Sequence, residues 1–193
     1  MARHSQPPKF LCANLHLDIG GNKKDAIMKK IVVNAASQEA VLYDGDSAIR
    51  LYVVSTAKNG LGCGDNSLCT PNGKLRIAEK IGDGLPIGTI LRGGEPTKKV
   101  WSSDPSNPLS TSQDDFVLSR ILRLGGCEPG NANTLKRCIY IHGTNHENLL
   151  GQPASHGCIR MSNTDGIELF DLVEVGDEVD VTAGHEEVAE TQV

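Results

Sequence analysis

Residues 139–163 read IYIHGTNHENLLGQPASHGCIRMSN, and this stretch decides how the rest of the chain is interpreted. The run Ile139-Tyr140-Ile141 is typical of a short buried strand, and His142 follows at its end. Sixteen residues after His142, a cysteine occurs in Ser155-His156-Gly157-Cys158. The segment therefore predicts a histidine at a strand end, facing a cysteine in a loop.

A cysteine and a histidine placed in this way can carry out nucleophilic catalysis. The thiolate is the form of cysteine that attacks a carbonyl, and a nearby imidazole is the usual means of lowering the thiol pKa. We therefore expect Cys158 to be the nucleophile and His142 the base. Gly157 allows close backbone approach, so the N–H groups of Gly157 and Cys158 are expected to bind an oxyanion. Taken singly, Cys158 reads as a small buried hydrophobe and His142 as a satisfied core histidine.

Arg160 lies two positions after the cysteine and is the one basic residue from position 139 to the C-terminus. A guanidinium in this place fits a bidentate clamp on a substrate carboxylate. The competing interpretation is a surface ion pair with Asp165 or Glu168, which contributes little. Charge alone does not separate the two.

Two other sites use the same segment. His142 and His146 have the spacing of a zinc-binding helix motif. However, Gly143 and Asn145 lie between them and disfavour a helix. A redox thiol pair of Cys158 and Cys138 is also disfavoured, because the chain has no C-x-x-C motif. Neither a metal nor a cofactor is expected.

The remainder of the chain is mainly β in pattern. Short β-branched runs between turn residues predict strands over 30–35, 40–43, 48–55, 74–79, 87–91 and 178–181. Residues 116–124 fit a helix or a strand equally well. Ser162 and Asp165 resemble a capping box before an apolar helical face, so one helix is expected after Cys158. The irregular stretches 57–69 and 102–115 are either a lid over the site or surface loops.

Composition excludes several classes of function. The chain has 193 residues, of which 38% are hydrophobic, and no apolar run approaches the ~20 residues that cross a bilayer. The formal net charge of −5 and an aromatic content of 4% argue against a nucleic-acid binder. Partners are therefore expected to be neither nucleic acid nor membrane, and the oligomeric state stays open.

The two ends of the chain read as extensions. Residues 1–29 form a basic N-terminal segment without the ~7–15 apolar residues of a secretory signal, and we expect a cytoplasmic protein with reduced thiols. A periplasmic location is the alternative if the true start lies upstream. Residues 183–193 are acidic and polar, typical of a disordered tail.

His142-Gly143-Thr144-Asn145 followed by Ser155-His156-Gly157-Cys158-Ile159-Arg160 resembles the signature of the L,D-transpeptidase (YkuD) family. Upstream, Thr70-Pro71-Asn72-Gly73-Lys74-Leu75-Arg76-Ile77 is similar to that family's TPxGxFxI element, with Leu75 in place of the usual Phe. The resemblance implies a catalytic domain over 30–182. The implied fold is mainly β, a sandwich-like sheet assembly with a small helix after the catalytic cysteine.

The resemblance also implies roles for individual residues. It implies that Cys158 is the nucleophile, His142 the base, and the Gly143 carbonyl the group that orients the imidazole. It makes Gly157 and Cys158 the oxyanion donors. For Arg160, it favours substrate binding over a surface pair. The other residues that it places at the substrate are Ser155, His156 and Thr144.

The activity implied by the resemblance is acyl transfer on peptidoglycan stem peptides or soluble muropeptides. A thioester forms on Cys158 as the bond between the L-centre, such as diaminopimelate, and D-Ala breaks. We expect water as the acceptor, which makes a murein tetrapeptide L,D-carboxypeptidase of a recycling pathway. The alternatives are a transpeptidase that forms cross-links or exchanges D-amino acids, and a catalytically silent muropeptide-binding domain.

Overall fold

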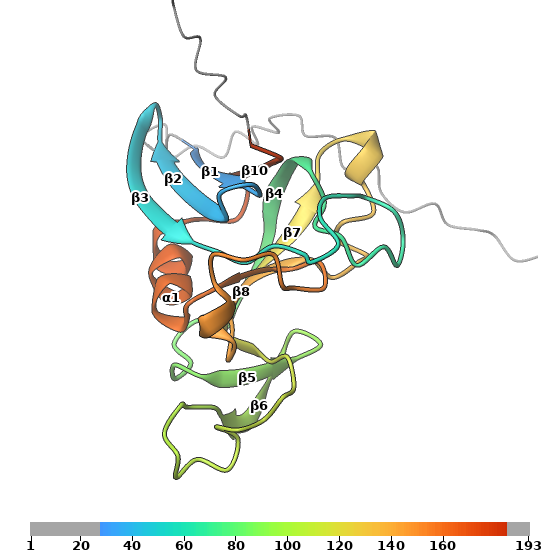
Figure 1. Ribbon diagram of the computed structural model, residues 1–193. Coiled ribbons are helices and arrows are strands. Elements are labelled where there is room, and N and C mark those ends of the chain that lie inside the picture. The colour runs from blue at the N-terminus through green and yellow to red at the C-terminus, as the bar shows by residue number, and fades with distance from the viewer. Residues whose placement is uncertain (1–27, 185–193) are drawn as a thin grey trace, which may run out of the picture.

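The computed structural model describes residues 28–184, which form a mainly β domain with one α-helix (Figure 1). Its elements are β1 (Lys29–Asn34), β2 (Glu39–Asp44), β3 (Ser47–Val53), β4 (Gly73–Ile81), β5 (Thr89–Arg92), β6 (Glu95–Val100), β7 (Val117–Gly126), η1 (Pro129–Asn131), β8 (Tyr140–Gly143), η2 (Glu147–Leu149), β9 (Ile159–Met161), α1 (Asn163–Leu172) and β10 (Glu178–Thr182). Among these residues, no helix is long and apolar enough to cross a membrane.

All ten strands belong to one mixed sheet. Their order is β3-β2-β1-β10-β4-β7-β5-β6, and β8 joins β7 and β9 beside this path. The first three strands are an antiparallel meander, as the sequence predicts. The closing strand β10 then lies between β1, to which it is parallel, and β4, to which it is antiparallel. The first and last strands of the domain are therefore neighbours.

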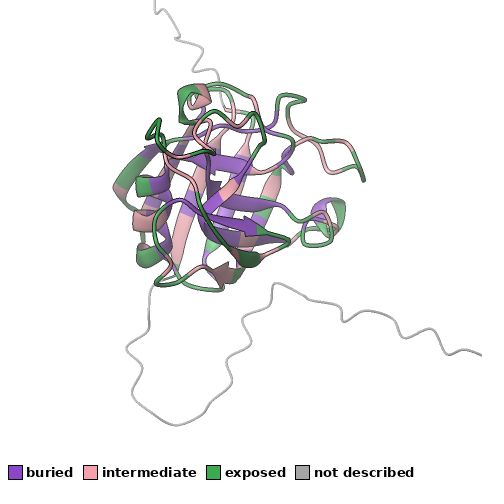
Figure 2. Ribbon diagram, turned by 90° about the horizontal axis from the view of Figure 1, so that it is seen from below, coloured by how far each residue is buried: buried purple, intermediate pink, exposed green. Residues whose placement is uncertain are grey.

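Period-two alternation decides which side chains enter the core. Ile31 and Val33 of β1 are fully buried, as are their register partners on β10, Val179 and Val181. Successive side chains of a strand point to opposite faces, so these two strands each give one apolar row to the core. Figure 2 shows the result: buried segments occupy the middle of the domain, and the exposed segments are mostly connections at its rim.

Strand β7 is the branch point of the sheet, pairing with β4, β5 and β8. The structure thus shows that residues 116–124, ambiguous in sequence, form a strand. Its pairing with β8 shifts register between Leu118 and Ile121, and Ser119 there has a φ of 65°. Along one edge β7 pairs first with β5 and then with β4, and its other edge is the platform for β8, the strand that carries His142.

Helix α1 begins as the capping pattern predicts. The Ser162 side chain accepts a hydrogen bond from the Asp165 N–H at 3.0 Å. Leu169 and Phe170 are buried against the sheet, together with Val173 just past the helix end. The helix lies beside β8 and directly after β9, so it packs behind the catalytic segment (Figure 1).

Three expectations need correction or fall outside the described residues. Two strands were not predicted: β6, which has no apolar alternation, and β9, which has only three residues. Lys29 belongs to β1 rather than to the N-terminal extension, whereas residues 1–27 and 185–193 of the two predicted extensions lie outside the described residues. Cys63, Cys69, Cys138 and Cys158 are free thiols, but Cys127 is disulfide-bonded, so the prediction of reduced thiols is wrong at that position.

Candidate active site

The two parallel strands β8 and β9 bring the predicted site residues together. His142 is directly opposite Arg160 in the register, and Cys158 immediately precedes β9. Directly paired residues of neighbouring strands point to the same face of a sheet. The sheet therefore places His142 and Arg160 on one face, at the strand that begins beside the cysteine, although sixteen residues separate His142 from Cys158 in the chain.

His142 is oriented by its own strand end. Its Nδ1 lies 2.7 Å from the carbonyl oxygen of Gly143. Because a carbonyl can only accept, the neutral ring carries its proton on Nδ1 and leaves Nε2 with a lone pair. Burial lowers the pKa of His142, partly offset by the Gly143 hydrogen bond and the Asp115 carboxylate. A neutral imidazole with Nε2 unprotonated is the form that a general base requires.

Glycine is the only residue type that fits at position 143, at the end of β8. A Cβ built there would lie 2.5 Å from the Asn163 Oδ1 and 3.0 Å from the Leu118 carbonyl oxygen. Asn163, the first residue of α1, is held by several bonds: its Nδ2 donates to the Thr144 carbonyl at 2.8 Å, and its Oδ1 accepts from the Ser119 hydroxyl at 2.6 Å. The helix start therefore fixes the backbone that orients His142.

The thiol of Cys158 is half-buried and not ionised at neutral pH. Burial raises its pKa to about 11, and the Asp115 carboxylate adds to this, while the Tyr140 backbone N–H and the Arg160 guanidinium act against it. The thiol also contacts the Cys138 carbonyl oxygen at 3.6 Å. The sequence led us to expect a lowered pKa, and this prediction is wrong, because desolvation outweighs the neighbouring positive charge. The resting pair is thus a neutral thiol and a neutral imidazole.

Ser155 shapes the turn that leads into the cysteine. It is buried, its hydroxyl donates to the Cys158 carbonyl oxygen, and it accepts a hydrogen bond from the Gly157 N–H at 3.2 Å. Gly157 has a φ of 131°, a conformation that side chains disfavour. The Gly157 N–H already has a partner in the resting turn, so the expected pair of oxyanion donors is not preformed at this residue.

Arg160 differs most from its predicted environment. Its side chain is only 3% exposed, and its guanidinium pairs with the Asp115 carboxylate, which lies at the end of the 102–115 segment. The alternative pair with Asp165 or Glu168 does not form, and Glu168 instead pairs with Arg50. Asp115 therefore binds the guanidinium that was expected to bind a substrate carboxylate.

Sequence comparison decides the family. The model for the L,D-transpeptidase (YkuD) catalytic domain matches residues 28–181. The chain belongs to this family. It is 27% identical over 152 residues to "Putative L,D-transpeptidase YqjB" of Bacillus subtilis, covering 79% of this chain and 70% of that protein. A shorter segment of 42 residues is 48% identical to "Putative L,D-transpeptidase YkuD" of Bacillus licheniformis, covering 22% of this chain and 26% of that protein.

Solved structures agree on the L,D-transpeptidase fold. An L,D-transpeptidase from Mycobacterium smegmatis matches with a TM-score of 0.52 and 18% identity over 81% of this chain and 59% of the other. The L,D-transpeptidase LdtMt1 in complex with imipenem matches with a TM-score of 0.50 and 22% identity, over 80% and 59%. The chain thus spans about three fifths of the length of these structures. The predicted fold, a sandwich-like β assembly with a small helix, is confirmed.

Two further residues of the L,D-transpeptidase signature, Thr144 and His156, lie in contrasting environments. Thr144 is fully buried, and its hydroxyl accepts from the His146 N–H at 3.1 Å, so it holds the turn after β8. His156 is open, with 68% of its side chain exposed, and its Nδ1 lies 3.4 Å from Asp115. His156 is therefore the signature side chain most accessible to a ligand.

Sequence reasoning missed Asp115 and Asn163 in this L,D-transpeptidase site. Asp115 contacts both Arg160 and His156, and nothing in its loop sequence singles it out. Asn163 follows the Ser162 cap, and this position indicates the start of a helix. It does not indicate that the Asn163 side chain packs against Gly143.

Proposed function

We propose that this chain is a cysteine acyltransferase that cleaves peptidoglycan stem peptides between the L-centre and the following D-Ala. The observation that supports it is the His142 ring held by the Gly143 carbonyl, on the strand paired with the one that Cys158 precedes. The family match adds the class of substrate. In this family the substrate is a wall peptide, and the same constellation suits attack on its amide carbonyl.

A neutral resting pair supports the following order of proton movements. His142 Nε2 takes the thiol proton as the Cys158 sulfur attacks the L-centre carbonyl. The tetrahedral oxyanion forms next to the Cys158 backbone N–H, where the Gly157 N–H joins it by exchanging its bond to Ser155. The C–N bond then breaks, and the proton on His142 passes to the amine of the departing D-Ala. A thioester on Cys158 remains.

The thioester can react with either of two acceptors. Water attacks with His142 as base and releases a tripeptide, which is the L,D-carboxypeptidase that the sequence led us to expect. An amine of a second stem peptide gives a cross-link, and the names of the curated relatives, putative L,D-transpeptidases, favour this second candidate. The cytoplasmic location and the recycling role remain predictions.

Mass spectrometry of purified protein with a diaminopimelate tetrapeptide tests the proposal. We expect a thioester adduct on Cys158, absent from Cys158→Ala, and free D-Ala as a product. Tripeptide as the main product in the presence of excess acceptor peptide indicates hydrolysis, and a cross-linked dimer indicates transpeptidation. Peptide binding to both proteins without any adduct or D-Ala would contradict acyl transfer and support the silent binding domain.

Imipenem offers a second probe of the Cys158 thiol, since the similar structure of LdtMt1 is a complex with this compound. A β-lactam carbonyl is acylating, so we expect one adduct on Cys158 whose rate of formation falls strongly in His142→Asn. Cys63 and Cys138, which are free thiols in the same chain, are internal controls for nonspecific modification.

A further inference from the structure

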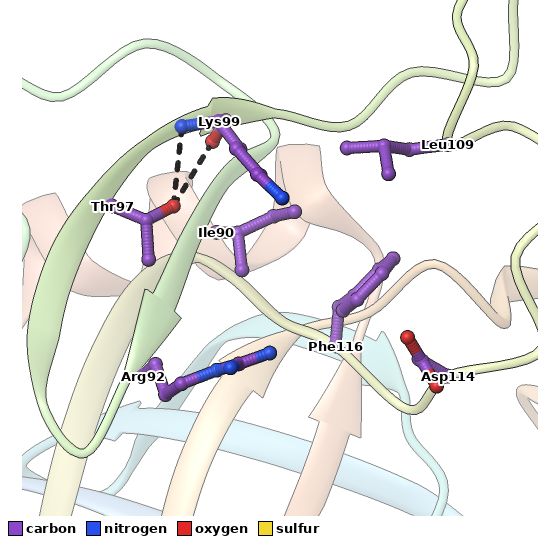
Figure 3. Close-up of a pocket in the computed structure, with 7 residues that line it drawn as sticks. All are labelled: Ile90, Arg92, Thr97, Lys99, Leu109, Asp114 and Phe116. Atoms are coloured by element: carbon purple, nitrogen blue, oxygen red, sulfur yellow. Dashed lines mark hydrogen bonds between the residues drawn. The ribbon is translucent and has the colours of Figure 1, made fainter.

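A small cavity lies next to the catalytic segment, between the β5–β6 hairpin and the end of the 102–115 segment (Figure 3). Its volume is about 190 Å³. The lining combines apolar and charged side chains: Ile90, Arg92, Thr97, Lys99, Leu109, Asp114 and Phe116. Nothing in the mechanism above uses this cavity.

The charged groups of the cavity form no ion pairs with other groups of the described part of the chain. Arg92 and Lys99 approach it from opposite sides of Ile90, and Asp114 lies next to Phe116 (Figure 3). Within residues 28–184, neither cation forms an ion pair with a carboxylate, and Asp114 forms none with a cation. The cavity thus presents two positive groups and one negative group that remain available to a ligand.

The cavity is tied to the catalytic segment through Asn145. The Asn145 side chain accepts from the Phe116 N–H at 2.9 Å and donates to the Asp114 carbonyl at 2.8 Å. Asn145 is three residues from His142, and the residue between Asp114 and Phe116 is Asp115, the partner of Arg160. One wall of the cavity is therefore also part of the active-site rim, so one extended substrate can reach both.

We propose that this cavity is a subsite for a substrate side chain that ends in a zwitterion, with an ammonium and a carboxylate on the same carbon. The carboxylate would bind Arg92 and Lys99, the ammonium would bind Asp114, and the methylene stem would pack on Ile90 and Phe116. The inference rests on the proposed function. It selects stem peptides of the diaminopimelate type over those whose third residue is lysine, which carries the ammonium alone.

The size of the cavity agrees with a single substituent. Pockets that enclose a drug-sized ligand are ~300–1,000 Å³. At about 190 Å³ this cavity is too small for a peptide, but it has room for the end of one side chain. The apolar part of the lining is well packed, since Ile90 and Phe116 are both buried in one cluster with Leu118, and Leu109 packs against it.

Binding to the full chain carrying Cys158→Ala tests the subsite without turnover. Isothermal titration would compare three tetrapeptides: diaminopimelate, its side-chain carboxamide, and lysine at the third position. We expect the diaminopimelate peptide to bind at least about tenfold more tightly than the other two, the loss of one charge-assisted bond. In Arg92→Gln/Lys99→Gln, this preference should disappear.

Lys98→Gln is the matched control, because Lys98 lies between the two cavity residues of β6 and points to the opposite face. It should keep the preference. Asp114→Asn should weaken the diaminopimelate peptide and its carboxamide equally, since both keep the ammonium. Circular dichroism checks that each variant is folded.

Two failures are distinguishable. If D-Ala is released and the diaminopimelate preference survives in Arg92→Gln/Lys99→Gln, or does not exist in the parent, the subsite is wrong and the proposed function stands. If no peptide acylates Cys158 in the wild-type chain, both are wrong.

Discussion

Replacing Asp115 by asparagine should cost about 2 kcal/mol of folding free energy, because it leaves the buried Arg160 cation without its partner. Breaking a fully buried pair costs ~3–5 kcal/mol, and breaking an exposed pair costs ~0–1 kcal/mol. Arg160 has a side chain 3% exposed and Asp115 one 34% exposed, so the pair lies between these limits. For a domain of this size, ~2 kcal/mol corresponds to a fall of about 4–8 °C in Tm.

Urea denaturation followed by circular dichroism measures this loss. The control is Glu168→Gln, which breaks the pair between Glu168 and Arg50. Their side chains are 42% and 53% exposed, so this variant should leave the stability nearly unchanged. The double variant Asp115→Asn/Arg160→Gln removes the uncompensated cation and should regain part of the loss. A loss for Asp115→Asn no larger than that for Glu168→Gln would refute the reasoning.

Four further outcomes follow from the site. Alkylation of Cys158 by iodoacetamide, followed by mass spectrometry, should have a midpoint near pH 11, and a midpoint below 8 would contradict the burial effect. The acidic limb of the pH profile of kcat/KM should have its midpoint below pH 6.5, because the pKa of His142 is lowered. The free energy of unfolding should also fall as the pH drops below 6.5, because the unfolded chain binds the proton of this histidine more tightly. Gly143→Ala should lose ~1–3 kcal/mol by overpacking, whereas Gly130→Ala, with open space around it, should be neutral in the same denaturation assay. Ser119→Ala should cost ~1–3 kcal/mol, since its hydroxyl bonds a buried backbone N–H and a buried amide oxygen, and an unchanged Tm would contradict this.

The sequence predicted strands from longer apolar runs between turn residues, and it missed β6, which has no apolar alternation, and β9, which has only three residues. Strand β1 has Ile31 and Val33 in period two, which is a local signal, and so it was found. Strand β6 is Glu-Pro-Thr-Lys-Lys-Val, and only its pairing with β5 makes it a strand. The ambiguity of residues 116–124 has the same origin, since pairing with three other strands is information that a local pattern does not contain.

At the site, the sequence predicted which residues carry the chemistry, but it did not predict their burial or the charges that surround them. Cys158 and His142 were found from residue type and spacing, and the Gly143 contact to the ring came from the family resemblance. The pKa of Cys158 is raised rather than lowered as expected, because the burial of the thiol is a property of the assembled fold. Asp115 was missed for the same reason: only folding brings the 102–115 segment to Arg160.

The central place of β10 has a consequence for synthesis on the ribosome. Of the strands in residues 28–184, this one is the last to leave the exit tunnel, yet it separates β1 from β4 in the sheet. Until residues 178–182 emerge, the β1–β3 meander and the β4 side both present open edges with unpaired backbone groups. Nascent chains stalled before this point should therefore be protease-sensitive and recruit chaperones, whereas completed chains should become resistant in a single late step.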